Sequence, residues 1–168
     1  MGSASLAPHL LRLAEIKDGD RVLDLGCGTG SLIRVARSDQ RVTDWVGIDP
    51  QPNAIARARQ KISVDELALV VGQAEAPPFA GDAFDKCLSL LVLQEFEDVL
   101  RVVTEMVRVT RPGGSVAAYQ WNYARMPIIS SVVHVLSAMN SGPGIDNLPA
   151  PATAADLENS GLTRAVPK

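Results

Sequence analysis

The 168-residue chain is poor in aromatic residues and cysteines and has no long apolar run. Its two cysteines, Cys27 and Cys87, do not make a disulfide framework, so we expect reduced thiols and a cytoplasmic protein. No apolar run approaches the roughly 20 residues of a membrane span, and no basic stretch followed by an apolar one marks a signal peptide. The composition therefore predicts neither a disulfide-stapled secreted domain nor a membrane protein.

Positive charge is also in short supply. The 16 Lys and Arg residues are outnumbered by 19 Asp and Glu residues, which leaves a net charge of -3. Such a balance argues against a general nucleic-acid surface, so we expect no nucleic-acid partner. His, Cys and carboxylate residues are nowhere clustered at metal-ligand spacing, so we expect no metal site. A hydrophobic fraction of 46% is that of an ordinary globular protein, and the length suits one domain over residues 1–168.

The sequence RVLDLGCGTG at residues 21–30 is the most informative stretch. A short apolar run that suits a buried strand leads into a turn with glycines at 26, 28 and 30, and residues 31–37 suit a helix. A strand, a glycine turn and a helix place backbone N–H groups and a helix N-terminus at the mouth of a sheet. Alternate glycines let the backbone turn tightly and let a ligand lie on it. We therefore expect a nucleotide-type binding loop here.

The spacing of the loop narrows the choice of nucleotide. A dinucleotide fingerprint, G-x-G-x-x-G, needs a glycine at position 31, where this chain has Ser31. Asp24 lies inside the strand, where a carboxylate disfavours a pyrophosphate and favours a cationic ligand. A second apolar strand ends in Asp49, which can bind both hydroxyls of a ribose. The alternatives are a purely structural glycine turn in another doubly wound domain and an NAD-dependent oxidoreductase.

This combination, D-x-G-x-G-x-G at one strand and an acidic residue ending the next, resembles the class I S-adenosylmethionine-dependent methyltransferases, and within them the small-molecule type similar to methyltransferase type 11. The resemblance covers residues 10–123, with FDKCLSLLVLQEFED, VTRPGG and AAYQWN as further blocks. It implies S-adenosyl-L-methionine as the cofactor. It also implies these contact residues: Asp24, Gly26, Cys27, Gly28, Gly30, Asp49, Pro50, Gln73, Ala74 and Leu90.

Each contact has an expected role by resemblance. Asp24 and the glycines surround the methionine part, and Asp49 takes the ribose hydroxyls. Gln73 and Ala74 hold the adenine, and Leu90 offers a backbone carbonyl near the amino group. Gln73 stands where the family usually has Asp, so we expect weaker adenine binding, because a neutral acceptor replaces a charged one.

Strand and helix patterns alternate, which predicts an α/β fold with a doubly wound, mainly parallel sheet, the Rossmann-like methyltransferase fold. In the family two more strands follow the fifth and complete a seven-stranded sheet, whereas this chain has room for at most one short one. We therefore expect the final strands to be missing and the exposed edge to drive formation of a homo-oligomer. The expected strands are residues 21–25, 45–48, 67–71, 84–92, 115–119 and 162–166. The expected helices are residues 5–16, 31–37, 53–61, 99–109, 128–139 and 153–159.

The sequence indicates the acceptor site only by position. The substrate candidates are the polar or aromatic residues expected near the carboxyl ends of the strands: Gln94, Tyr119, Trp121, Asn122 and His134. Of these, Tyr119 also suits a core position, and Trp121 also suits a cover over the cofactor. None is a convincing general base, so no catalytic residue is assigned, and proximity catalysis or an already nucleophilic acceptor is favoured.

The leading hypothesis is methyl transfer from S-adenosylmethionine to a small-molecule acceptor by in-line displacement. The alternative is a non-catalytic S-adenosylmethionine-binding or interaction module, or a fragment of a longer methyltransferase. The identity of the acceptor, and whether nitrogen, oxygen or carbon is methylated, cannot be inferred from these residues.

Overall fold

The computed structural model describes residues 3–38, 44–62 and 68–120, which belong to one compact unit. The helices are α1 (Ser3–Leu13), α2 (Ser31–Ser38), α3 (Pro52–Lys61), α4 (Val99–Val109) and the short 3-10 helix η1 (Leu93–Glu95). The strands are β1 (Arg21–Leu25), β2 (Asp44–Asp49), β3 (Ala68–Val71), β4 (Phe84–Leu90) and β5 (Thr110–Tyr119).

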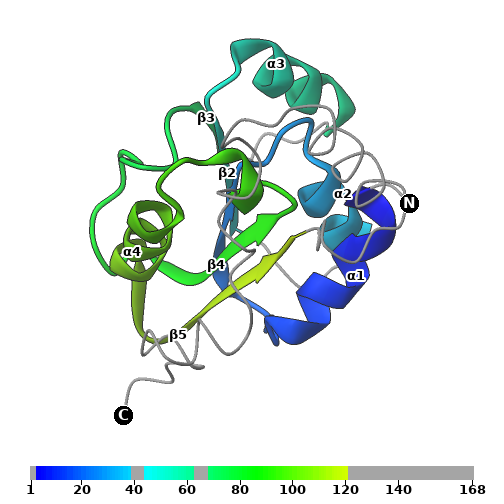
Figure 1. Ribbon diagram of the computed structural model, residues 1–168. Helices are drawn as coiled ribbons and strands as arrows, with labels where there is room; N and C mark the ends of the chain where they lie inside the picture. Colours follow the sequence, from blue (N-terminus) through cyan, green and yellow to red (C-terminus); the bar gives the residue numbers. More distant parts are fainter. Residues whose placement is uncertain (1–2, 39–43, 63–67, 121–168) are drawn as a thin grey trace, which may run out of the picture. The chain divides into compact units, whose positions relative to one another are not determined.

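The five strands form one parallel sheet in the order β3-β2-β1-β4-β5 (Figure 1). The chain begins the sheet at its centre, adds β2 and β3 on one side and then adds β4 and β5 on the other. The strand order therefore reverses between β1 and β4, and in open α/β sheets ligands bind at the carboxyl ends of strands beside such a reversal. The parallel, doubly wound sheet expected from the sequence is confirmed for this part of the chain.

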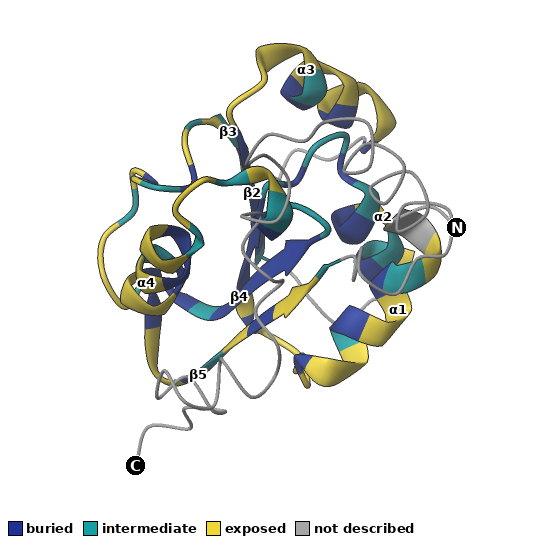
Figure 2. Ribbon diagram, in the orientation of Figure 1, coloured by how far each residue is buried: buried dark blue, intermediate teal, exposed yellow. Residues whose placement is uncertain are grey.

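Helices cover both faces of the sheet. Helices α1 and α2 lie side by side on one face, and α4 packs against β4 and β5 on the other (Figure 1). The middle strands are buried almost throughout, as the dark colouring of β4 in Figure 2 shows. Burial on both faces explains why residues 22–25 of β1 and 87–90 of β4 are mostly apolar and do not alternate strictly between apolar and polar residues.

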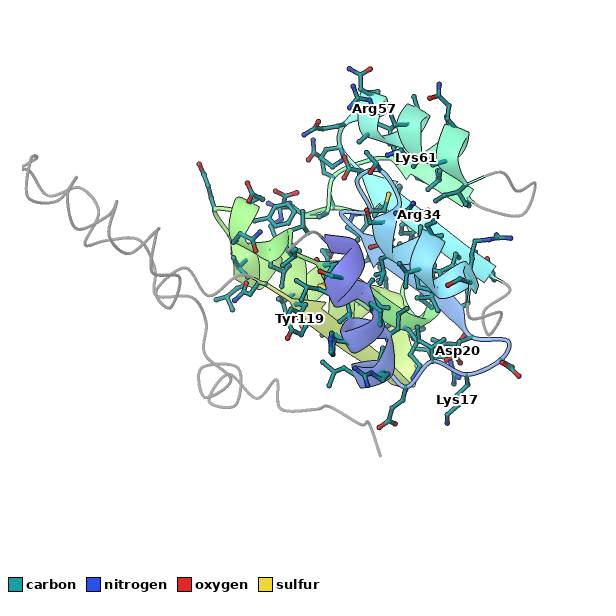
Figure 3. The ribbon with its side chains drawn as sticks, turned by 90° about the vertical axis from the view of Figure 1, so that its right-hand side faces the viewer. Lys17, Asp20, Arg34, Arg57, Lys61 and Tyr119 are labelled. Carbon is teal, nitrogen blue, oxygen red and sulfur yellow. The ribbon has the colours of Figure 1, made fainter. Side chains whose placement is uncertain are left out.

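The strand β5 is the edge of the described sheet on its side, and it is longer and more exposed than expected. It begins at Thr110, before the predicted start at residue 115, and its register shifts between Phe84 and Lys86 of β4. The RPGG turn therefore lies within the strand as an irregularity. Tyr119, which suited a core position in the sequence, is 39% exposed (Figure 3).

Two other elements end earlier than the patterns predicted. Helix α1 stops at Leu13 instead of residue 16, and Glu15 then has a φ of 49°. Strand β4 stops at Leu90 instead of residue 92, because Leu91 has a φ of 61° and cannot continue an extended strand. The elements predicted after residue 120 lie outside the described residues, so the extent of a single domain over residues 1–168 stays a prediction.

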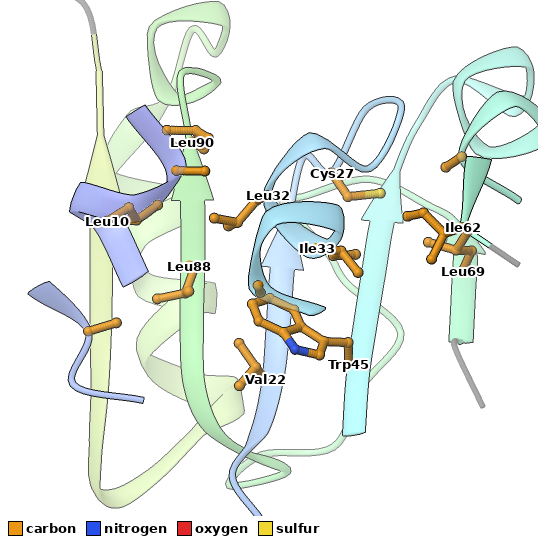
Figure 4. Close-up of a cluster of buried hydrophobic side chains, with 14 of the residues drawn as sticks. Leu10, Val22, Cys27, Leu32, Ile33, Trp45, Ile62, Leu69, Leu88 and Leu90 are labelled. Carbon is orange, nitrogen blue, oxygen red and sulfur yellow. The ribbon is translucent and has the colours of Figure 1, made fainter. Parts of the chain in front are cut away.

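The largest side chain of the core fixes the central strands beneath α2. Trp45 of β2 is 1% exposed and lies between Ile33 of α2 and Val22 of β1 (Figure 4). Leu10 of α1 and Leu88 of β4 belong to the same cluster. Fully burying each such side chain contributes about 1.5–3 kcal/mol. This packing holds β1, β2 and β4 together, and the candidate site is built at their carboxyl ends.

Candidate cofactor site

The glycine loop after β1 uses its three glycines for different purposes. All three have positive φ, at 76° for Gly26, 53° for Gly28 and 78° for Gly30. A Cβ at Gly26 would lie 2.5 Å from Val92 Cγ1, and one at Gly30 would lie 2.4 Å from Ile62 Cδ1. A Cβ at Gly28 would meet nothing within 4 Å. Gly26 is thus required by packing against the branched Val92 side chain, whereas the clash at Gly30 involves only the movable end of Ile62, and the space over Gly28 is open to a ligand.

The backbone N–H groups of the loop point at the protein itself, which differs from the expectation that they face the mouth of the sheet. The N–H groups of Gly26 and Cys27 both donate to the Ile48 carbonyl, at 2.9 and 3.0 Å. The Gly30 N–H donates to the Cys27 carbonyl at 2.8 Å. These donors are therefore not available to a phosphate, so the loop is poorly suited to a pyrophosphate.

Asp49 joins the loop to the end of β2. Its carboxylate is 8% exposed; Oδ2 accepts the Gly28 N–H at 2.9 Å and Oδ1 accepts the Gln51 N–H at 2.9 Å. A carboxylate has about four lone-pair positions, so two remain for a ligand. Pro50, the next residue, is exposed. Asp49 therefore has the chemistry to accept hydroxyl donors while it holds the loop in place.

Asp24 is a buried acid beneath the loop. It is 1% exposed, and its Oδ2 has no hydrogen-bond partner among the described residues. Burial, with repulsion from the Asp49 carboxylate as a second cause, raises the pKa of Asp24 to about 7. A cation placed beside it would favour the ionised form. The unpaired oxygen and the two like charges fit a ligand that brings positive charge or N–H donors.

The segment after β3 borders the same end of the sheet. The Gly72 N–H donates to the Asp49 carbonyl at 3.1 Å, so the residues that follow are tied to β2. Gln73 is exposed and Ala74 is 2% exposed. Sequence reasoning missed Glu75, whose Oε2 is buried without a partner in the described part of the chain. Its position, only two residues after Gln73, was the sequence feature that could have marked Glu75 as a candidate.

The end of β4 completes the site. Leu90 is 8% exposed, and the next residue, Leu91, has left-handed backbone geometry. Gln94 Nε2 donates to the Leu91 carbonyl at 2.6 Å, while Gln94 Oε1 is buried without a partner among the described residues. Val92, which packs against Gly26, was not predicted, because nothing in an aliphatic sequence marks such a contact.

Of the substrate candidates, Gln94 and Tyr119 lie at the ends of neighbouring strands. The Tyr119 carbonyl accepts the Leu91 N–H at 2.6 Å, which connects β5 to the turn that Gln94 contacts. Trp121, Asn122 and His134 lie outside the described residues. Within residues 3–38, 44–62 and 68–120, no group of His, Cys, Asp or Glu could hold a metal ion.

The two thiols are unreactive in this setting. Cys27 in the loop and Cys87 in β4 are both free and buried. Burial raises the pKa of each thiol well above its usual range, and the nearby Asp24 charge adds to the rise. Cys27 therefore contributes backbone and bulk to the loop.

Among the described helices, none is long and apolar enough to cross a membrane.

The sequence also matches a known family. The model of the methyltransferase domain matches residues 23–118. This range covers the glycine loop, both aspartates and all five strands except the first two residues of β1 and the last residue of β5. The chain is 37% identical over 107 residues to a malonyl-[acyl-carrier protein] O-methyltransferase from Serratia marcescens, covering 63% of this chain and 40% of the relative. It is 30% identical over 120 residues to the demethylmenaquinone methyltransferase of Bacillus subtilis, covering 69% of this chain and 52% of that protein.

Solved structures agree with the sequence comparison. An S-adenosylmethionine-dependent methyltransferase from Mesorhizobium loti superposes with a TM-score of 0.66 at 27% identity, covering 74% of this chain and 58% of that one. The chain thus spans about half the length, or less, of the curated relatives it matches.

Proposed function

Because this chain belongs to the methyltransferase domain family, which it matches over residues 23–118, we propose that it transfers a methyl group from S-adenosylmethionine to a small-molecule acceptor. Family membership confirms the predicted cofactor. The small-molecule acceptor is proposed by similarity, because the two curated relatives are named for a malonyl group on a carrier protein and for demethylmenaquinone. A cytoplasmic location and a homo-oligomer are further proposals.

The residues present fit this cofactor. The unpaired Asp24 Oδ2 can take an N–H donor of a cationic group, and the two free lone-pair positions of Asp49 can take two ribose hydroxyls. The open space over Gly28 lets a ligand lie against the backbone. The observation that carries the proposal is the hydrogen bond that ties the open Gly28 to Asp49, with the buried Asp24 close enough to feel the Asp49 charge.

In the proposed mechanism the protein acts mainly by positioning. The cofactor would supply a methyl group activated by its sulfonium: the bond to the acceptor would form at the methyl carbon as the carbon–sulfur bond breaks in line, with S-adenosylhomocysteine as the leaving group. Asp49 and the segment at Gln73 and Ala74 would fix the nucleoside end, while Asp24 and the glycine loop would fix the amino-acid end. Orientation of this kind can supply up to about 7–11 kcal/mol of a barrier. An acceptor that is already nucleophilic needs no base, which agrees with the absence of a basic side chain in the described site.

A thermal-shift measurement with S-adenosylmethionine, S-adenosylhomocysteine and NAD tests this proposal. At about 100 times the dissociation constant, a ligand adds about 2.7 kcal/mol, which raises Tm by about 5–10 °C for a chain of this size. A shift with the first two ligands and none with NAD is expected. Absence of any shift would contradict the proposed cofactor site.

The second candidate is a non-catalytic S-adenosylmethionine-binding module. The exposed Gln73, standing where the family usually has Asp, favours it, because adenine would then gain only a neutral hydrogen bond. Turnover separates the two candidates. Release of S-adenosylhomocysteine on addition of an acceptor supports the methyltransferase, whereas binding without release across a broad acceptor screen supports the module.

A further inference from the structure

The chain leaves β4 through a residue in an unfavourable conformation. Leu91 has a φ of 61°, a region that residues other than glycine, asparagine and aspartate seldom adopt. Leucine has no side-chain oxygen that could bond to its own backbone and so ease this geometry. Such a residue persists only where its surroundings hold it from more than one side.

Two short hydrogen bonds hold Leu91. Its N–H donates to the Tyr119 carbonyl of β5 at 2.6 Å, a backbone contact that any sequence could make. Its carbonyl accepts from Gln94 Nε2, also at 2.6 Å, and this second bond depends on one side chain. The other contact of the Gln94 amide, to Glu95 Oε1, is longer at 3.5 Å. The Leu91 carbonyl is therefore the main polar partner of Gln94 within the described residues.

The conformation of Leu91 decides where its neighbours lie. It turns the chain so that Val92 packs against the glycine loop, with Val92 Cγ1 only 2.5 Å from the position of a Cβ on Gly26. Leu90, whose carbonyl is proposed to face the cofactor, immediately precedes the turn. If Leu91 relaxed to a negative φ, the chain direction between Leu90 and Val92 would change and Val92 would leave Gly26.

We propose that Gln94 is a positioning residue for the cofactor: its amide holds Leu91 in the left-handed conformation and thereby keeps the end of β4 packed on the glycine loop. This rests on the proposed function, because the cofactor is what the held turn serves. The buried, unpaired Gln94 Oε1 is unfavourable in itself, so the bond to Leu91 must offset its burial. Gln94 then acts through the backbone of Leu91 and need not touch the acceptor.

The test uses three variants and one control. Gln94→Met keeps the length of the side chain and removes its hydrogen bonds. Leu91→Gly adopts positive φ without strain, so it should no longer need Gln94. The double variant combines the two, and Gln60→Met is the matched control on the exposed side of α3. The readouts are the dissociation constant of S-adenosylhomocysteine by calorimetry and hydrogen exchange of the amide of residue 91.

Gln94→Met is expected to weaken the binding of S-adenosylhomocysteine by about tenfold, which is the effect of losing one good hydrogen bond. Hydrogen exchange of the amide of residue 91 is expected to become faster by a similar factor. The double variant is expected to bind within about threefold of Leu91→Gly, and the control is expected to behave as wild type. Rescue by a glycine at another position is something that a purely local packing role of Gln94 would not produce.

Three results would overturn the inference. The first is a wild-type dissociation constant in Gln94→Met, even if exchange at residue 91 rises. The second is a double variant that binds as weakly as Gln94→Met, because the loss would then not pass through Leu91. The third is unchanged exchange at residue 91 in Gln94→Met, which would refute the hold on Leu91. Failure of the wild type itself to bind the ligand would instead refute the proposed function.

Discussion

The N–H of Gly28 donates to Asp49 Oδ2 at 2.9 Å, which joins the open glycine of the loop to the last residue of β2. The same carboxylate accepts the Gln51 N–H, at the entrance to α3. One side chain thus fixes both the loop over which the cofactor is proposed to lie and the turn that leads into α3. Loss of the Asp49 charge should therefore affect binding and loop geometry together.

Asp49→Asn is expected to weaken S-adenosylhomocysteine by at least about tenfold and to lower stability by about 1–3 kcal/mol, because an amide offers one oxygen where two N–H groups need acceptors. Calorimetry and thermal unfolding measure the two effects. Asp82→Asn is the matched control, since Asp82 is exposed and its φ of 58° suits asparagine. Unchanged affinity in Asp49→Asn would remove the ribose assignment.

Asp24 is expected to make the ligand-free protein less stable as pH rises. Its folded pKa of about 7 lies above the ordinary value of 3.8, so between these pH values the folded chain holds more protons than the unfolded chain. This contribution is fully present below the unfolded pKa and is lost as pH rises through the folded pKa. The difference corresponds to as much as about 4 kcal/mol.

Asp24→Asn removes this dependence, because an amide of similar size never ionises. Thermal unfolding from about pH 5 to about pH 8 should show the Tm of Asp24→Asn increasing relative to the Tm of wild type as pH rises. Asp18→Asn, on an exposed turn, is the control. A constant difference in Tm between Asp24→Asn and wild type across this range would show that Asp24 does not titrate there.

Alanine substitutions at two glycines of the loop should have different effects on stability and on ligand binding. Gly26→Ala is expected to cost about 3 kcal/mol, since the new methyl group combines a positive φ with a clash against the stiff side chain of Val92. Gly28→Ala should cost only about 1 kcal/mol, because its Cβ meets open space. That space is where the ligand is proposed to lie, so Gly28→Ala should lose affinity for S-adenosylhomocysteine more than stability.

Denaturant unfolding and calorimetry on both variants check this order. Adding Val92→Ala to Gly26→Ala should recover part of the lost stability, because it removes the clash and leaves only the backbone strain. Equal destabilisation by the two alanines, with equal loss of binding, would contradict the division of roles within the loop.

Gln73→Asp is expected to tighten the binding of S-adenosylhomocysteine by about threefold to tenfold. A charged acceptor gives a hydrogen bond of about 1.5–3 kcal/mol, against about 1 kcal/mol for an amide. Gln73 is exposed, so part of the gain is lost to solvent. Calorimetry measures the change, with Gln60→Glu on α3 as the control. A weaker dissociation constant would place Gln73 away from the adenine amine.

Self-association through the edge at β5 is expected if that strand pairs with a second copy. Val116 and Tyr119 leave apolar surface at this edge of the described sheet, at 37% and 39% exposed. Light scattering across a wide concentration range would then show a rising mass, and Val116→Lys would suppress the rise. A constant monomer mass at every concentration would refute it.

Local patterns were enough to predict most of the sheet. Strands β1 and β4 are short segments with an apolar majority, and the glycines between β1 and α2 mark a sharp change of direction. Asp24 was predictable because it stands two residues before the first glycine of the loop, and Asp49 because it ends β2. Pro52 at the start of α3 gave its boundary in the same way.

Tertiary contacts decided what the patterns could not. The N–H groups of Gly26 and Cys27 turn inward because the Ile48 carbonyl lies beside them, and that carbonyl belongs to another strand. Leu91 carries none of the glycine or asparagine character that usually announces a positive φ. The high pKa of Asp24 depends on burial and on Asp49, two conditions that only the assembled sheet provides.

The order of the strands also has a consequence for synthesis on the ribosome. β1 emerges first yet occupies the centre of the sheet, and its partner on one side, β4, is made about sixty residues later, as the pairing of Leu23 with Cys87 shows. The nascent chain therefore carries β1, a strand buried in the finished sheet, with one edge unpaired while β2, β3 and their connections are being added. Until β4 arrives, that edge is an opening for aggregation or for a chaperone.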